Sequence, residues 1–154
     1  MNVLFVCLGN ICRSPSAEGV FRQVLEAQGM QDRVTVDSCG IGDWHVGKSP
    51  DARAQQAARR RGIDISHLRA RQLCREDFSH FDYILAMDHD NLNAIRAMQP
   101  ADYTGDSRLF LAFAGQPDSA VPDPYYGGKE GFEDVLNLIE SASQGLVTHL
   151  RQAL

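Results

Sequence analysis

The stretch that decides the fold is residues 2–15, NVLFVCLGNICRSP. Residues 2–7 form a continuous apolar run, which is typical of a strand covered on both faces of a sheet. From residue 15 to residue 28 the apolar side chains recur at helical spacing instead. Ser14 and Pro15 suit the start of that helix, serine as the N-cap and proline at the first helical position. The stretch therefore predicts a buried strand, a tight loop and the beginning of a helix.

The rest of the chain repeats this alternation of strand and helix. Further strands are expected at residues 34–38, 81–87 and 108–113. Further helices are expected from Ser49-Pro50 to Gly62, from a cap at Asp88 to Pro100, and through residues 132–150. Strands separated by helices imply right-handed crossovers and a mostly parallel sheet, so the expected fold class is α/β.

Length and composition fit one globular domain over residues 1–154. The chain has 154 residues, of which 44% are hydrophobic and 23% are charged, and domains commonly run to about 100–200 residues. No apolar stretch approaches the roughly 20 residues that cross a bilayer. The N-terminus lacks the basic region of a signal peptide. We therefore expect a cytoplasmic protein without membrane insertion.

The net charge argues against a nucleic-acid-binding site, and the spacing of the cysteines argues against a metal site. The net charge is −5, which disfavours nucleic-acid binding, because neutralising phosphates requires a basic surface. The arginines at 59–61 are read as a mostly solvated helix face. The four cysteines, Cys7, Cys12, Cys39 and Cys74, form no C-x-x-C pair, so we expect no metal and no cofactor. Cys39 and Cys74 are expected in the core as small apolar residues.

The loop between the first strand and its helix has the features of an oxyanion site. Parallel sheets bind ligands at the carboxyl ends of their strands, and backbone N–H groups before a helix can surround an anion. Gly9 and Asn10 tolerate the left-handed backbone of a curled loop. Cys7 lies beneath this ring, which favours a thiolate nucleophile. Arg13 can hold two phosphate oxygens, and Ser14 can stabilise the leaving thiolate or cap the helix.

A general acid is expected in residues 121–128, VPDPYYGG. The phenolate that leaves phosphotyrosine has a conjugate acid with a pKa of about 10, so a proton donor speeds its departure. Asp123 lies between two prolines that stiffen its position, and Tyr125 and Tyr126 can wall a slot for a flat ring. Read alone, the segment is also an ordinary surface turn, since Asp-Pro and Gly-Gly are turn signals.

Together the two segments resemble the low-molecular-weight protein tyrosine phosphatases. The similarity covers residues 6–18, 43–53 (DWHVGKSPDAR), 81–88 (FDYILAMD) and 121–128. A C-x5-R-S loop near the N-terminus combined with D-P-Y-Y near the C-terminus is highly specific. The resemblance implies a single three-layer domain, with a four-stranded parallel sheet flanked by helices. It also implies a phosphocysteine intermediate that forms without a metal.

By position, the resemblance implies that Cys7 is the nucleophile, that Arg13 binds phosphate and stabilises the transition state, and that Asp123 is acid and then base. Ser14 would stabilise the thiolate, and Asn10 would brace the loop. Cys12 would match a second cysteine that can form a protective disulfide with Cys7 under oxidation. The expected substrate-binding residues are Leu8, Gly9, Asn10, Ile11, Cys12, Ser14, Trp44, Tyr125 and Tyr126.

No histidine is expected in this site. Some family members place a histidine directly before an Ala-Arg-Gln segment, but here Leu68 and Arg69 precede that segment, so the role of His67 stays open. The others have no ligand spacing and are expected at the surface: His45, His80, His89 and His149.

The expected partners are phosphotyrosine-containing proteins, with inorganic phosphate or another oxyanion as an inhibitor in the loop. The chain is expected as a monomer or with weak self-association. Two other functions fit part of the sequence. An arsenate reductase of similar fold needs a relay of resolving thiols, and Cys39 and Cys74 form no close-spaced pair. A non-catalytic phosphotyrosine-binding module would not need the intact cysteine, arginine and aspartate.

Overall fold

The centre of the protein is a parallel sheet of four strands. The computed structural model of the protein describes residues 1–125, 127 and 129–154. The strands lie in the order β2-β1-β3-β4, and every neighbouring pair is parallel. Their bounds are Asn2–Cys7 for β1, Thr35–Gly40 for β2, Tyr83–Ala86 for β3 and Asp106–Leu109 for β4. The predicted α/β class with a four-stranded parallel sheet is confirmed.

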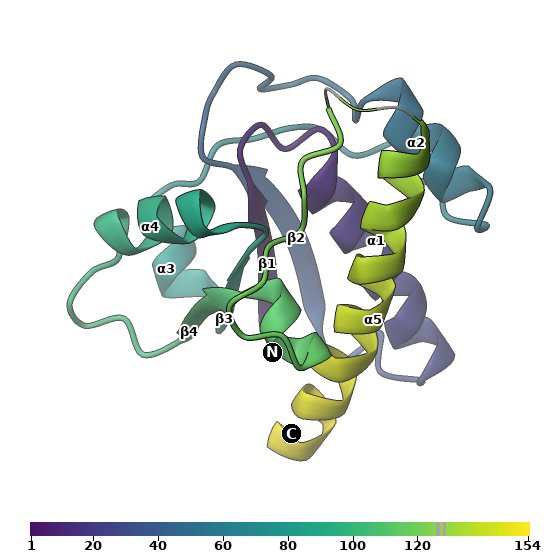
Figure 1. Cartoon of the computed structure of the whole chain (residues 1–154). Helices are drawn as coiled ribbons and strands as arrows, with labels where there is room; N and C mark the ends of the chain where they lie inside the picture. Colours follow the sequence, from purple (N-terminus) through teal and green to yellow (C-terminus); the bar gives the residue numbers. More distant parts are fainter. Residues whose placement is uncertain (126, 128) are drawn as a thin grey trace.

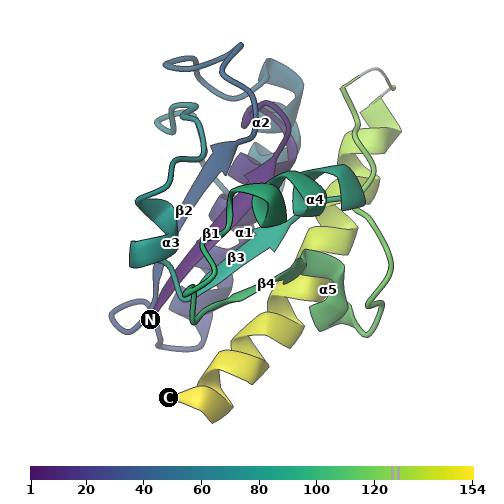
Figure 2. The same ribbon diagram turned by 90° about the vertical axis from the view of Figure 1, so that its left-hand side faces the viewer.

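Helices cover both faces of the sheet (Figures 1 and 2). On one face lie α1 (Arg13–Ala27) and α5 (Lys129–Ala153), and on the other lie α3 (Asp77–His80) and α4 (His89–Met98). The short helix α2 (Ala52–Arg59) packs against α1 and α5, and the 3-10 helix η1 (Phe110–Ala114) packs against α5. Among the residues described, no helix is both long and apolar enough to span a membrane.

The central strand β1 is buried on both faces. Successive side chains of a strand point to opposite faces. Val3, Phe5 and Cys7 therefore belong to the core under α1 and α5, and Leu4 and Val6 belong to the core under α3 and α4. This two-sided burial is why β1 reads as an unbroken apolar run in the sequence. It also directs the Cys7 side chain toward the start of α1.

Both predicted helix starts at a Ser-Pro pair are wrong. α1 begins at Arg13 with Cys12 as its N-cap, so Ser14 lies within the first turn and its hydroxyl bonds to the loop instead of capping the helix. The next helix begins two residues after its Ser-Pro pair, because the carboxylate of Asp51 accepts the hydrogen bond from Arg53 N and serves as the cap.

Two further expectations about burial and structure are wrong. The strand predicted at residues 108–113 ends at Leu109, and η1 follows it. A short apolar run does not distinguish a strand from a buried helical turn, and here Phe110 turns inward and packs edge-on against Phe5. Cys74 is exposed rather than in the core, whereas Cys39 is buried as expected.

Candidate active site

The loop after β1 lies at the point where the strand order of the sheet reverses. β2 joins one edge of β1 and β3 joins the other, and α/β proteins bind ligands at such a point outside the strand ends. The loop stays close to β2, since the carbonyl of Leu8 accepts a 2.9 Å hydrogen bond from Gly42 N. Gly40 permits this approach, because a Cβ there would lie 2.9 Å from the Leu8 carbonyl oxygen.

The Cys7 sulfur is enclosed by hydrogen-bond donors. The residue is only 3% exposed, and its Sγ accepts a hydrogen bond from Asn10 N at 3.2 Å and lies 2.9 Å from Ser14 Oγ. The Ser14 hydroxyl accepts a hydrogen bond from Asn10 Nδ2, so its own proton is free to point at the sulfur or at the Cys39 carbonyl 3.3 Å away. Donors of this kind stabilise negative charge on the sulfur.

Asn10 holds the loop in its curled shape. Its φ is 58°, and no other non-glycine residue in the described part of the chain has a positive φ. Asparagine tolerates this conformation better than most residues. Its side chain donates to Ser14 Oγ at 2.7 Å and to Ser38 Oγ at 3.1 Å, and accepts from Arg71 N at 3.0 Å. Ser38 in turn donates to the buried carboxylate of Glu18 at 2.7 Å. The loop therefore lies on a fully hydrogen-bonded polar layer.

Arg13 is buried beside the loop and is held by the carboxylate of Asp88. Its Nη1 donates to Asp88 Oδ2 at 2.7 Å and to the Val121 carbonyl at 3.1 Å, and its Nη2 lies 3.6 Å from Asp123 Oδ2. Asp88 was predicted only as the cap of α4, which it is, since Oδ1 accepts from Asn91 N at 2.8 Å. Its second oxygen, Oδ2, thus orients the Arg13 guanidinium.

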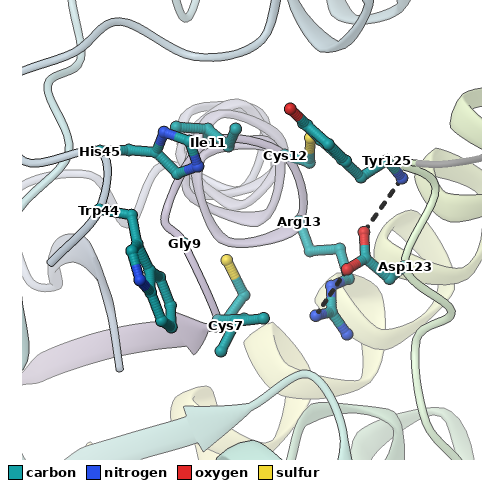
Figure 3. A pocket seen from close by; sticks show the side chains of 10 residues that line it. Cys7, Gly9, Ile11, Cys12, Arg13, Trp44, His45, Asp123 and Tyr125 are labelled. Atoms are coloured by element: carbon teal, nitrogen blue, oxygen red, sulfur yellow. Dashed lines mark hydrogen bonds and ion pairs between the residues drawn. The ribbon is translucent and has the colours of Figure 1, made fainter. Parts of the chain in front are cut away.

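The candidate residues meet around one open cavity of about 450 Å³ (Figure 3). Trp44 and His45 form one side, and Asp123 and Tyr125 form the other, with the Cys7 sulfur between them. The carboxylate of Asp123 accepts a hydrogen bond from Tyr125 N at 3.0 Å, and this bond helps to orient the carboxylate. Apolar walls and few polar groups are typical of a small-molecule site.

Most of the predicted site residues line this cavity. They are Cys7, Leu8, Gly9, Ile11, Cys12, Arg13, Trp44, Asp123 and Tyr125. Asn10 and Ser14 are buried and brace the loop, and Tyr126 lies outside the described residues. His45 was expected at the surface but lines the cavity, where its ring lies against Gly9. Its position next to Trp44 in the sequence was the one available signal.

The second cysteine of the loop is a buried thiol. Burial, together with the negative charge of Asp51, raises the pKa of Cys12 far above its ordinary value. Burial likewise raises the pKa of Cys39. Both residues are reduced in this structure. A disulfide between Cys7 and Cys12 stays a prediction. Among the described residues, no three His, Cys, Asp or Glu side chains gather as a metal site requires.

Similar proteins place the chain in one family. Residues 2–154 match the family described as low molecular weight phosphotyrosine protein phosphatase. A protein of that name from Schizosaccharomyces pombe is 47% identical over 149 residues, which cover 96% of this chain and 95% of that protein. A solved protein tyrosine phosphatase from Entamoeba histolytica has a TM-score of 0.94 at 36% identity, covering 99% and 98% of the two chains. A Drosophila arginine phosphatase has a TM-score of 0.91 at 34% identity, covering 97% and 98%. The chain therefore belongs to the low molecular weight phosphotyrosine protein phosphatase family.

Proposed function

We propose that this protein hydrolyses phosphotyrosine in proteins, and small aryl phosphates, through a phosphocysteine intermediate on Cys7. The observation that carries the proposal is that the Cys7, Arg13 and Asp123 side chains line the same cavity, where the Cys7 sulfur faces the other two. A nucleophile, a phosphate ligand and a proton donor within one apolar-walled cavity are the groups that cleavage of a phosphate ester requires. Membership of the family supports the same activity.

In the first step the Cys7 thiolate attacks phosphorus in line with the scissile bond. The S–P bond forms and the bond from phosphorus to the phenolic oxygen breaks. Backbone amides of the loop and the Arg13 guanidinium hold the three equatorial oxygens, and Asp123 gives its proton to the departing phenolate. Positioning and charge stabilisation supply most of the rate in phosphoryl transfer. Arg13 suits this role because Asp88 fixes one edge of its fork.

In the second step water attacks the phosphocysteine. The Asp123 carboxylate, left unprotonated by the first step, takes a proton from that water. The S–P bond breaks, inorganic phosphate leaves, and the Cys7 thiolate is restored next to Ser14 Oγ. One aspartate thus serves as acid and then as base, and no redox partner is needed.

The walls of the cavity support a flat aromatic substrate. Leu8, Trp44 and Tyr125 expose large apolar surfaces beside the sulfur, and aromatic rings pack well against such walls. A phosphorylated guanidinium would need polar partners in the same place, and one relative of known structure is an arginine phosphatase. Phosphoarginine is therefore the informative comparison substrate.

The experiment measures hydrolysis of para-nitrophenyl phosphate, phosphotyrosine peptide and phosphoarginine with and without a chelator. We expect the aryl substrates to be preferred, the chelator to have no effect, and Cys7→Ser to lose on the order of 10⁴-fold or more of the activity. Full activity of Cys7→Ser would contradict the proposal. Thioredoxin-coupled arsenate reduction exceeding aryl phosphate hydrolysis would favour the arsenate reductase, and binding without turnover would favour the non-catalytic module.

A second variant tests the acid. We expect Asp123→Ala to reduce kcat/KM by about 10²–10⁴-fold for phenyl phosphate, and by less for para-nitrophenyl phosphate, whose phenolate needs less protonation to leave. An equal loss for both substrates would remove the acid role from Asp123.

We further propose that residues 1–154 act as one cytoplasmic phosphatase domain, monomeric or weakly self-associating, and that inorganic phosphate inhibits it by occupying the loop. Reduced thiols fit a cytoplasmic protein. Sedimentation of the purified chain tests the association state, and a stable high-order oligomer would contradict it. Steady-state kinetics with added phosphate tests the inhibition, and a non-competitive pattern would contradict occupation of the loop.

A further inference from the structure

The segment that carries Asp123 is anchored firmly at its upstream end. Val121 N donates a 2.7 Å hydrogen bond to the Met87 carbonyl just beyond β3, and the Val121 carbonyl accepts one from Arg13. Asp123 itself is much less enclosed, with its side chain 40% exposed. The Asp123 carboxylate also lies 3.6 Å from Arg13 Nη2. Because Val121 lies two residues before Asp123, the direction of the carboxyl depends as well on contacts further along the segment.

Arg53 of α2 supplies such contacts downstream of the acid. Its Nη2 donates to the Tyr125 carbonyl at 2.9 Å, and its Nη1 reaches the Gly127 carbonyl at 3.5 Å. The guanidinium also lies over two rings, 5.5 Å from the centre of Tyr125 and 4.9 Å from that of Phe132 in α5. Guanidinium groups are attracted to aromatic faces at such distances. One side chain thus joins α2, the segment after Asp123 and the first turns of α5.

The same side chain is tied back to the phosphate loop. The Asp51 carboxylate accepts hydrogen bonds from Arg53 Nε and Nη2, each at 3.1 Å. Asp51 N donates to the Ile11 carbonyl of the loop at 2.8 Å. A continuous path of hydrogen bonds therefore runs from Ile11 through Asp51 and Arg53 to the Tyr125 backbone. The Tyr125 backbone N–H in turn holds Asp123.

We propose that Arg53 is a positioning residue that fixes the Asp123 carboxyl at the right distance from a phosphoryl group on Cys7. The inference rests on the proposed acid role of Asp123. Arg53 acts through the backbone of residues 121–125, which we call the acid segment. Its own hydrogen bonds go to Asp51 and to two carbonyls, and it does not line the cavity.

The test compares Arg53→Met with Arg60→Met. Arg60 is a matched control, since its side chain is 42% exposed against 44% for Arg53, and it pairs with Glu133 of α5 rather than with the acid segment. We expect Arg53→Met to lower kcat/KM for phenyl phosphate about tenfold and that for para-nitrophenyl phosphate about twofold or less, because a displaced acid matters most for a poor leaving group. Arg60→Met should leave both values unchanged.

A double mutant separates positioning from direct binding of substrate. In the Asp123→Ala background, Arg53→Met should cause no further loss, because the group that it positions is already gone. A loss that persists there, or one equal for both substrates, would overturn the inference. Should Asp123→Ala itself show no dependence on the leaving group, the proposed acid role fails, which is a different result.

Arg53→Lys covers the case in which Arg53→Met does not fold. Lysine keeps the charge but cannot reproduce the planar fork that joins Asp51 to the Tyr125 carbonyl. We expect it to show the same selective loss on phenyl phosphate, at about threefold or more. Wild-type activity of a folded Arg53→Lys on both substrates would overturn the inference.

Discussion

The loop that carries Cys7, the proposed nucleophile, and the segment that carries Asp123, the proposed acid, are built in different ways. The first is a short continuous stretch, residues 7–14, in which the Cys7, Asn10 and Ser14 side chains bond to one another and Asn10 also bonds to Ser38 of the buried strand β2. Asn10 alone makes three side-chain hydrogen bonds within this buried layer. The position of the Cys7 sulfur is therefore set by neighbours in the sequence and by burial.

The acid segment depends on contacts from distant parts of the chain. Met87 and Arg13 hold its upstream end, and Arg53 holds its downstream end. Asp123 lies between these anchors and is partly exposed. The difference teaches that the Cys7 sulfur is positioned mainly by residues close to it in the sequence, whereas the Asp123 carboxyl is positioned by tertiary contacts. Changes in the phosphate loop should affect every substrate and the stability of the fold, and changes around the acid should depend on the leaving group.

The largest expected effect comes from Arg13→Lys. A lysine in this buried position cannot bind Asp88 and two phosphate oxygens in one plane. We expect kcat/KM to fall on the order of 10²–10³-fold for para-nitrophenyl phosphate, and at least as much for phenyl phosphate, since Arg13 also bonds to the Val121 carbonyl. Steady-state kinetics with the two substrates checks this. A loss confined to phenyl phosphate would show that Arg13 acts only through the acid segment, and it would contradict a role of Arg13 in binding the phosphoryl group.

Asn10→Ala tests how far the phosphate loop depends on its buried hydrogen bonds. The change removes the partners of Ser14, Ser38 and Arg71 N, and alanine is also less tolerant of a φ of 58°. We expect the free energy of unfolding to fall by about 2–4 kcal/mol, as measured by urea denaturation. Pro122→Ala in the exposed acid segment is the contrast, with an expected change below about 1 kcal/mol. Equal effects would contradict the difference in construction.

Asp88→Asn separates the two contacts of Asp88, which caps α4 and pairs with Arg13. Asparagine keeps the oxygen that caps α4 through Asn91 N, but it removes the charge that pairs with the guanidinium. We expect kcat/KM to fall about tenfold, with no dependence on the leaving group. The helix content by circular dichroism should be unchanged. A leaving-group-dependent loss would show that Asp88 acts on Asp123 rather than on Arg13.

The smallest expected effect concerns the buried thiol of the phosphate loop. Burial raises the pKa of Cys12 above its unfolded value of about 8.5. The neutral thiol therefore contributes stability that is fully present below that pH and is lost as the pH rises. Between pH 7.5 and 9.5 wild type should lose about 1 kcal/mol more stability than Cys12→Ala. Urea denaturation of both proteins at each pH measures this difference. If the free energy of unfolding falls equally with pH in both proteins, Cys12 is not a buried neutral thiol.

The sequence predicts the local part of this site well. Cys7, Arg13 and the strand that precedes them lie within one short stretch, so spacing and element order suffice to bring them together. The helix start at Ser14-Pro15 and the strand through Phe110 are the predictions that the structure contradicts, because a Ser-Pro pair and a short apolar run each fit two structures. In both cases tertiary contacts decide, with Cys7 and Asn10 for Ser14 and with Phe5 for Phe110.

The distant part of the site was harder to predict. Asp88 fits a helix cap so well that nothing local indicates a second partner 75 residues away at Arg13. Arg53 and His45 reach the site only because the long connection between β2 and β3 folds back over the strand ends. Such pairings are properties of the topology and leave no periodic signal in the chain.

The most direct test is to find where the phosphoryl group resides during turnover. Asp123→Asn is mixed rapidly with para-nitrophenyl phosphate, whose phenolate leaves readily without a proton donor, and quenched. The para-nitrophenol released is counted, and the modified residue is located by mass spectrometry. Because this variant lacks the base for the second step, we predict a burst approaching one phenol per enzyme and a phosphoryl group on Cys7. A steady release of phenol without a burst, or a phosphoryl group on any other residue, would contradict the account.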